Sequence, residues 1–183
     1  MNIVFLDQGT FSPETTLRSF SFSNQLSVYG STSSDEVTSR IADADVVITN
    51  KVRLTAEMIA AAPRLKLIAV AATGTDNIDL SACADHQVVV SNIRNYAIHT
   101  VPEHTLALIF SLRRSITAYV DSVKAGRWQE SGQFCYFDYP IRDLAGSTLG
   151  IIGDGVLGQS VANLGRALGM RVLISGFKGR TGQ

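Results

Sequence analysis

Short apolar runs that recur at a steady interval dominate the first half of the chain. They are continuous rather than alternating, are rich in β-branched residues, and lie at residues 3–6, 26–29, 46–48, 67–71 and 88–90. Continuous runs of this length are typical of strands that are buried on both faces, as in parallel sheets. The pattern therefore predicts five buried parallel strands within residues 1–95.

Signals for the start of a helix lie between these runs. Ser33 and Glu36 have the spacing of a capping box, and Thr55 stands just ahead of an apolar pair. Asp79 is suited to cap a short helix that runs through Ala84. Because strands alternate with helices, we expect residues 1–95 to form a flavodoxin-like, doubly wound α/β domain.

The pattern changes after Asn92. Pro102 suits the first turn of a helix, and apolar residues at helical spacing follow it to about Tyr119, which predicts one long helix. An irregular aromatic stretch follows at residues 128–139. Two further apolar runs, at 148–152 and 171–175, flank a predicted helix at 156–168. Residues 96–183 are therefore expected to hold a hinge, a long helix and the first βαβ unit of a Rossmann nucleotide-binding domain.

A G-x-G-x-x-G motif directly follows the first of those two runs and opens the helix after it. Gly153 would allow the tight turn, Gly155 the close approach of a pyrophosphate, and Gly158 close packing of helix on strand. Val156 and Leu157 begin the helix, whose N-terminus would face the phosphates. The motif predicts a dinucleotide site. A glycine-rich turn in an unrelated α/β protein and an S-adenosylmethionine loop of a methyltransferase are the alternatives.

The end of the last predicted strand bears on the choice of cofactor. A carboxylate normally stands there to accept the ribose 2′-hydroxyl of NAD, but this chain has Gly176, followed by Lys178 and Arg180. Either basic side chain would pair with a 2′-phosphate, so NADP is favoured over NAD. The alternative is that both are solvated surface residues.

A second candidate site follows the fourth predicted strand, at residues 72–77. Ligands of open sheets bind at the carboxyl ends of the strands, and backbone N–H groups around Gly74 would suit a substrate carboxylate. An ordinary βα turn is an equally good interpretation of the same residues.

Composition excludes several classes of protein. Sixteen basic and sixteen acidic residues give no net charge, and 45% of the chain is hydrophobic, which excludes disorder for most of its length. A neutral chain has no electrostatic reason to bind nucleic acid or an anionic membrane. No apolar run reaches the length of about 18 residues that a membrane span needs.

The cysteines and histidines do not suggest a reactive or metal centre. Cys83 and Cys135 cannot form a disulfide framework and lack basic neighbours, so both are interpreted as structural. With no signal-peptide pattern at the start of the chain, they favour a cytoplasmic location. His86, His99 and His104 do not have the spacing of zinc ligands, and no metal site is expected.

Three motifs together resemble the D-isomer-specific 2-hydroxyacid dehydrogenase family. They lie at residues 71–79, 95–104 and 144–153, and the resemblance covers essentially the whole chain. Residues 50–52, 126–128 and 139–144 are similar to the glycerate dehydrogenase, or hydroxypyruvate reductase, group within it.

This resemblance implies an oxidoreductase that transfers a hydride from NADPH or NADH to a small 2-keto acid of the hydroxypyruvate or glyoxylate kind, giving the D-2-hydroxy acid. It implies that Lys51 and the backbone at Thr73 and Gly74 bind the substrate, and that residues 128–139 pack in a homodimer. The family also uses an Arg and a His–Glu pair, to which no residue here can be matched. We therefore expect these residues downstream of Gln183, and expect the chain, which looks truncated, to be inactive alone.

Two rival functions follow from the same features. A non-catalytic dinucleotide-binding or dimerisation module derived from the family would bind NADPH without turnover, since a fold does not fix a function. A methyltransferase would account for the glycine motif but for neither residues 71–79 nor residues 95–104. The family resemblance therefore favours the dehydrogenase.

Overall fold

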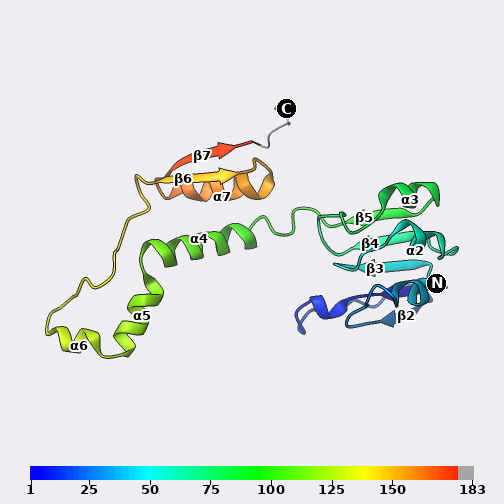
Figure 1. The fold of residues 1–183 in the computed structure, drawn as a ribbon, viewed down its shortest axis with the longest axis horizontal. Coiled ribbons are helices and arrows are strands. Elements are labelled where there is room, and N and C mark those ends of the chain that lie inside the picture. Colours follow the sequence, from blue (N-terminus) through cyan, green and yellow to red (C-terminus); the bar gives the residue numbers. More distant parts are fainter. Residues whose placement is uncertain (177–183) are drawn as a thin grey trace. The chain divides into compact units, whose positions relative to one another are not determined.

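The computed structural model describes residues 1–176, which divide between Arg94 and Asn95 into two compact units (Figure 1). The first unit is built on one sheet and the second on a pair of strands with helices. No helix among the described residues has the length and hydropathy needed to cross a membrane.

The sheet of the first unit has five parallel strands in the order β2-β1-β3-β4-β5. Their bounds are β1 Asn2–Phe5, β2 Gln25–Val28, β3 Val46–Thr49, β4 Leu67–Val70 and β5 Val89–Asn92. This order is that of flavodoxin-like doubly wound sheets, so the predicted fold class is confirmed. The predicted burial is wrong for β2 and β5, whose side chains are exposed or half-buried because these strands lie at the edges of the sheet. The short 3-10 helix η1, Gln8–Thr10, follows β1.

Helices α1 (Val37–Ile41), α2 (Ala56–Ala60) and α3 (Leu80–Asp85) connect the later strands. The predicted caps of α2 and α3 are confirmed: Thr55 accepts the N–H of Met58, and Asp79 accepts the N–H of Ala82 at 2.9 Å. The predicted box at α1 forms only in part. Glu36 accepts the N–H of Ser33 at 3.0 Å, but the Ser33 hydroxyl donates to the same carboxylate instead of accepting an N–H.

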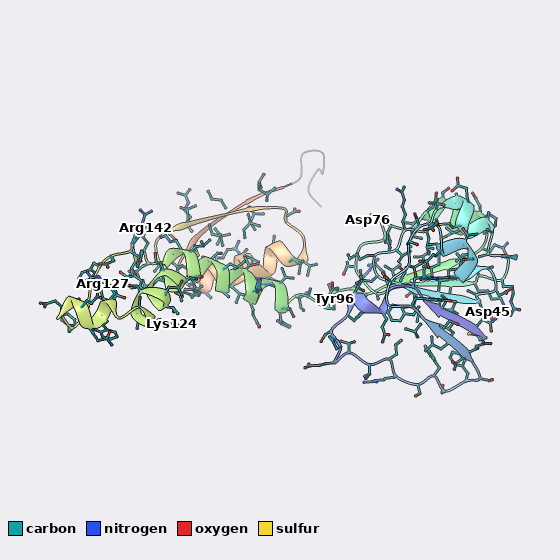
Figure 2. All side chains as sticks on the ribbon, turned by 60° about the horizontal axis from the view of Figure 1, so that its bottom comes forward. Asp45, Asp76, Tyr96, Lys124, Arg127 and Arg142 are labelled. Carbon is teal, nitrogen blue, oxygen red and sulfur yellow. The ribbon has the colours of Figure 1, made fainter. Side chains whose placement is uncertain are left out.

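Asp45 fixes the amino edge of this sheet, directly ahead of β3 (Figure 2). Its carboxylate accepts the N–H of Asn2 at 2.7 Å and pairs with Arg64 at 3.2 Å. The Asn2 hydrogen bond, and after it the Arg64 guanidinium, hold the pKa of the Asp45 carboxyl below its ordinary value.

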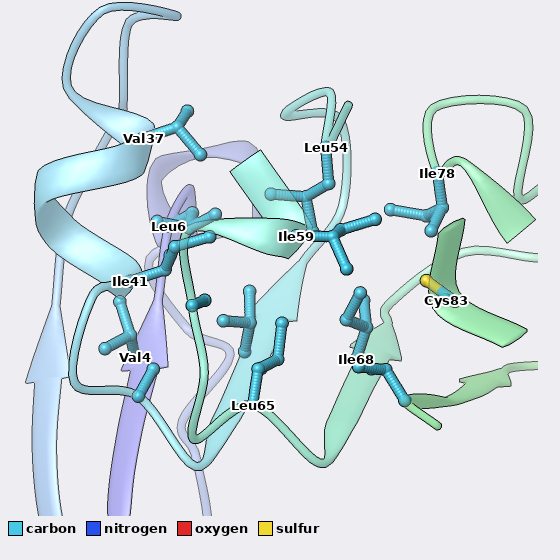
Figure 3. Close-up of a cluster of buried hydrophobic side chains, with 14 of the residues drawn as sticks. Val4, Leu6, Val37, Ile41, Leu54, Ile59, Leu65, Ile68, Ile78 and Cys83 are labelled. Carbon is cyan, nitrogen blue, oxygen red and sulfur yellow. The ribbon is translucent and has the colours of Figure 1, made fainter. Parts of the chain in front are cut away.

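The core lies between the three helices and one face of the sheet (Figure 3). It consists of Val4, Leu6, Val37, Ile41, Ala44, Val47, Leu54, Ile59, Ala62, Leu65, Ile68, Val70, Ala72, Ile78, Ala82, Cys83 and Val88. The alternate strand residues point to the other face, where Phe20 and Phe22 of the long β1–β2 connection border an apolar hollow of 590 Å³.

The second unit contains helices and one parallel strand pair. Its elements are α4 Thr100–Arg113, α5 Ile116–Lys124, α6 Arg127–Ser131, β6 Thr148–Ile152, α7 Val156–Ala167 and β7 Arg171–Ser175. Strands β6 and β7 pair in parallel, with α7 as the helix between them, and α4 packs against α7 (Figure 1). The predicted βαβ unit is therefore present.

Two predictions about the helices of this unit are wrong. The single helix expected from Pro102 to Tyr119 is broken at Ser115, which has a φ of 50° and lies between α4 and α5. Tertiary contacts hold this break: the Ser115 hydroxyl donates to the carbonyl of Pro140 at 2.7 Å, and the N–H of Arg142 donates to the carbonyl of Arg113 at 2.9 Å. Conversely, helix α6 lies partly within the stretch predicted to be irregular.

Candidate functional site

The loop after β4 carries free N–H groups at the carboxyl edge of the sheet. The amides of Thr73, Gly74 and Thr75 donate to no acceptor within residues 1–176. The loop is nevertheless fixed, because the Thr73 hydroxyl donates to the carbonyl of Ile93 at 2.8 Å and the Asn92 side chain donates to the carbonyl of Thr73 at 2.7 Å. A fixed loop with free donors is suited to bind an anion such as a carboxylate.

The neighbouring loop after β3 has the opposite arrangement. Asp7, which is only 3% exposed, accepts the N–H groups of Asn50, Lys51 and Val52. The Asn77 side chain donates to the carbonyl of Val52 at 2.9 Å, which joins this loop to the one after β4. The structure thus places the predicted substrate residues Lys51, Thr73 and Gly74 on adjacent loops.

Sequence reasoning did not single out Asp7. The signal was its place directly after the first apolar run, since a carboxylate at the end of a buried strand lies at the ligand edge of a parallel sheet.

Lys51 lines a hollow of 420 Å³ at the carboxyl ends of β1 and β3. The order of the strands reverses between these two, and open sheets bind ligands at such a point. Arg53 adds a second cation, and hydroxyl groups come from Thr10, Ser31, Thr32, Ser34 and Thr55. Asp7 also lines the hollow, but both of its carboxylate oxygens accept backbone N–H groups, which leaves the cations and hydroxyl groups to bind a small, oxygen-rich anion.

The three motif glycines between β6 and α7 differ in what they require. Gly153 has a φ of 104°, a backbone conformation that favours glycine. A Cβ on Gly158 would collide with the carbonyl oxygen of Gly153. A Cβ on Gly155 would meet nothing within 4 Å, so the space there is open from the protein's side.

Helix α7 offers unpaired donors beside that open space. Gly155 is its N-cap and has no side chain to cap it, and the N–H groups of Val156, Leu157 and Gly158 donate to no acceptor within residues 1–176. These groups and the positive end of the helix dipole fit a pyrophosphate. The residues present therefore fit a dinucleotide.

The end of β7 lies beside the glycine loop, because the N–H of Gly153 donates to the carbonyl of Ser175 at 2.8 Å. Gly176 follows directly and is exposed. Lys178 and Arg180 lie outside the described residues, so the preference for NADP stays a prediction.

A sequence model described as "D-isomer specific 2-hydroxyacid dehydrogenase, catalytic domain" matches residues 4–173. The chain belongs to this family. It is 51% identical over 172 residues to a glycerate dehydrogenase of Methylorubrum extorquens, covering 93% of this chain and 54% of the relative. It is 33% identical over 177 residues to a hydroxypyruvate reductase of Blautia hydrogenotrophica, covering 94% of this chain and 55% of the relative. The chain thus spans about half the length of these relatives.

Solved structures with nicotinamide cofactors are similar in fold. A D-lactate dehydrogenase from Aquifex aeolicus, complexed with NAD and lactic acid, aligns with a TM-score of 0.70 and 32% identity over 85% of this chain and 46% of that one. An acyclic imino acid reductase in complex with NADPH and D-Arg aligns with a TM-score of 0.78 and 26% identity over 100% of this chain and 58% of that one. Dinucleotides of both kinds therefore occur among its structural relatives.

The remaining reactive side chains of this dehydrogenase-family chain are not assembled into a site. His86, His99 and His104 are exposed, and their side chains make no hydrogen bond or ion pair within residues 1–176. No three His, Cys, Asp or Glu side chains in that part of the chain lie together as metal ligands would. Burial, and after it the charge of Asp79, raises the pKa of the Cys83 thiol, which supports its structural interpretation.

An aromatic arm, residues 115–141, extends from the end of α4. Tyr119 holds it together: its hydroxyl donates to the carbonyl of Tyr139 at 2.9 Å, and its ring lies 5.4 Å from that of Tyr136. Arg127 pairs with Asp138 at 2.7 Å. Two other aromatic side chains of the arm, Phe134 and Phe137, are 88% and 83% exposed.

Proposed function

We propose that the first unit binds a small 2-keto acid and the second a nicotinamide dinucleotide, as parts of a D-2-hydroxyacid dehydrogenase that reduces hydroxypyruvate or glyoxylate to the D-2-hydroxy acid. The observation that carries this proposal is the set of free N–H groups at Thr73, Gly74 and Thr75 on a rigid loop of a family member. The names of the glycerate dehydrogenase and hydroxypyruvate reductase relatives support the substrate class.

Each element has a defined part in this proposal. The free N–H groups of residues 73–75 bind the substrate carboxylate, and the Lys51 ammonium, on the adjacent loop, adds a positive charge. The open space at Gly155 and the free N–H groups of α7 hold the pyrophosphate. When bound, the reduced dinucleotide supplies the hydride that reduces the keto carbon.

We further propose that the 183-residue chain binds both ligands without turnover, because none of its histidines is paired with a carboxylate within residues 1–176. Adding hydroxypyruvate to pure chain and NADPH is expected to leave the NADPH absorbance constant. Steady oxidation at a rate above that of a chain-free control would contradict this.

The proposed preference for NADP rests on Gly176, Lys178 and Arg180. Replacing both basic residues by alanine should weaken NADPH binding by about tenfold or more, the size of one or two lost charge-assisted contacts, and leave NADH binding unchanged. Equal loss for both cofactors would contradict a role in recognising the 2′-phosphate.

We also propose that the arm, residues 115–141, pairs with the arm of a second copy, since Phe134 and Phe137 would otherwise expose their rings to water. Analytical ultracentrifugation should show that the chain sediments as a dimer, and Phe137→Ser should shift the equilibrium toward monomer.

The free thiols of Cys83 and Cys135 are the basis for proposing a cytoplasmic location.

A pair of glycine variants tests the dinucleotide site directly. Gly155→Ala has room in the fold but fills the space where the pyrophosphate would approach, so it should leave thermal unfolding unchanged and weaken NADPH binding by about tenfold or more. Gly158→Ala should instead lower stability, by about 1–3 kcal/mol, because its Cβ meets a backbone carbonyl. S-adenosylmethionine should not compete with NADPH. Competition by it, or full NADPH affinity in Gly155→Ala, would overturn the dinucleotide assignment.

A further inference from the structure

Asp7 is a buried carboxylate without a basic partner. Among residues 1–176 it forms no ion pair, and its side chain is satisfied by three consecutive backbone N–H groups. Asn50 donates to Oδ1 at 2.9 Å, while Lys51 and Val52 donate to Oδ2 at 2.6 and 3.3 Å. Hydrogen bonds to an ionised acceptor are about twice as strong as neutral ones, so this contact fixes the loop firmly.

The same contact decides what the loop can offer to a ligand. Successive N–H groups form a nest that binds anions, and here the protein's own carboxylate occupies it. The backbone at residues 50–52 is therefore unavailable to a substrate, in contrast with the free N–H groups at residues 73–75. The group of this loop that remains available to bind an anion is therefore the Lys51 side chain.

We infer that Asp7 is a positioning residue: it holds the backbone of Lys51 so that the Lys51 ammonium binds an anion in the 420 Å³ hollow that Lys51 lines. The inference rests on the proposed function. Asn77 holds the same loop from its other side, through the carbonyl of Val52. The Lys51 side chain and the free N–H groups are thus fixed relative to one another by Asp7 and Asn77. Asp7 also lines the hollow, but the backbone N–H groups occupy both of its carboxylate oxygens.

Amide NMR of the 183-residue chain titrated with hydroxypyruvate tests this. In the wild-type chain the amide signals of residues 73–75 should shift, and those of residues 50–52 should be protected from exchange. Asp7→Asn keeps the shape but loses the charge and one of the two acceptor oxygens, so exchange at residues 50–52 should accelerate. The dissociation constant should rise about threefold to tenfold, which corresponds to releasing one ordered long side chain.

Asp45→Asn is the matched control. Asp45 is also a buried aspartate that accepts a backbone N–H, but it lies ahead of β3 at the amino edge of the sheet (Figure 2), whereas Asp7 follows the carboxyl end of β1. Asp45→Asn should lower the free energy of unfolding without changing the affinity for hydroxypyruvate. Lys51→Met separates positioning from stability: it should weaken binding about tenfold, the loss of one charge-assisted contact, and adding Asp7→Asn to it should weaken binding no further.

The outcomes are distinct. No shift at residues 73–75 in the wild-type chain would overturn the proposed function, and the inference with it. If the wild-type chain binds hydroxypyruvate, two results would overturn the inference alone. One is that Asp7→Asn leaves the affinity unchanged, and the other is that it lowers the affinity equally with and without Lys51. If Asp7→Asn does not fold, Asn77→Ala tests the loop from its other anchor, and the inference requires that it lower affinity only when Lys51 is present.

Discussion

The inner strands of the first unit and the strand pair of the second unit have similar compositions but are buried to very different extents. In the first unit, strands β3 and β4 alternate fully buried and half-buried side chains, with Val47 and Ile68 completely inaccessible. In the second unit, β6 and β7 alternate half-buried and exposed side chains, and Ile152 is 88% exposed. The edge strands β2 and β5 of the first unit are exposed to a similar extent as β6 and β7, so the two units differ in the burial of the inner strands rather than in strand propensity.

The cores differ in the same way. Within residues 95–176 the buried hydrophobic residues are Leu106, Leu144, Val161, Ala162 and Met170, while a cluster several times larger fills the first unit. Since burial of apolar surface is the main stabilising contribution to folding, the first unit should carry most of the stability of the isolated chain. A second copy of the chain that covers the exposed side chains of the second unit would reduce this difference in stability.

Hydrogen exchange should show the largest contrast. Amides of β3 and β4 should exchange at least about 100-fold more slowly than those of β6 and β7, because local opening costs less free energy where few apolar contacts hold the strands. Mass spectrometry of peptic fragments from a verified monomer measures this. Strong protection across residues 148–175 under those conditions would contradict the lower stability expected for β6 and β7.

A matched pair of isoleucine truncations measures how much the buried side chains of each unit contribute to its stability. Ile68→Ala empties a fully buried site on β4 and should lower the free energy of unfolding of the first unit by about 2–5 kcal/mol. Ile151→Ala removes a half-buried side chain of β6 and should cost clearly less, because part of its surface is already hydrated. Urea unfolding followed separately for each unit gives both values, and equal losses would argue against unequal cores.

The same contrast shows what the sequence could and could not predict. Continuous apolar runs located all five strands of the first sheet to within a residue or two, and Thr55 and Asp79 marked their helices, because those signals are local. The break at Ser115 depends on contacts with residues 140–142, far along the chain, so helical periodicity missed it. Helix α6 did have a local signal, since Gly126 and Gly132 flank it with positive φ angles.

The candidate sites divide along the same line. The glycine motif was predicted with its local roles because strand, turn and helix are contiguous in the sequence. The hydrogen bonds that Asp7 accepts from residues 50–52 instead join segments more than forty residues apart. No spacing rule predicts such a contact. The topology does, because it places β1 next to β3.

A smaller effect concerns the side-chain N-caps, which α2 and α3 of the first unit have and the described helices of the second unit lack. Thr55→Ala removes the side-chain acceptor for Met58 and should cost about 1 kcal/mol of unfolding free energy, while Thr55→Ser should restore most of it. Helix α7 has Gly155 at the same position and no side-chain cap to lose. A loss below a few tenths of a kcal/mol for Thr55→Ala would mean that packing alone fixes α2.

The smallest expected effect is a pH dependence confined to the first unit. Cys83 is buried, and burial, with the charge of Asp79 adding to it, raises the pKa of its thiol above the ordinary value of 9.0. On raising the pH through this value the unfolded chain loses the thiol proton before the folded one does. The stability that the protonated thiol contributes is therefore fully present below pH 9.0 and is lost as the pH rises through the folded pKa.

The free energy of unfolding of Cys83→Ala and of wild type, measured at several pH values on both sides of 9.0, tests this. It should fall less steeply with pH in Cys83→Ala at the alkaline end, and groups common to both chains cancel in the comparison. Asp79→Asn keeps an N-cap acceptor but removes the charge, so its slope should lie between those of wild type and Cys83→Ala. Equal slopes for Cys83→Ala and wild type would mean that the thiol does not remain protonated in the folded unit.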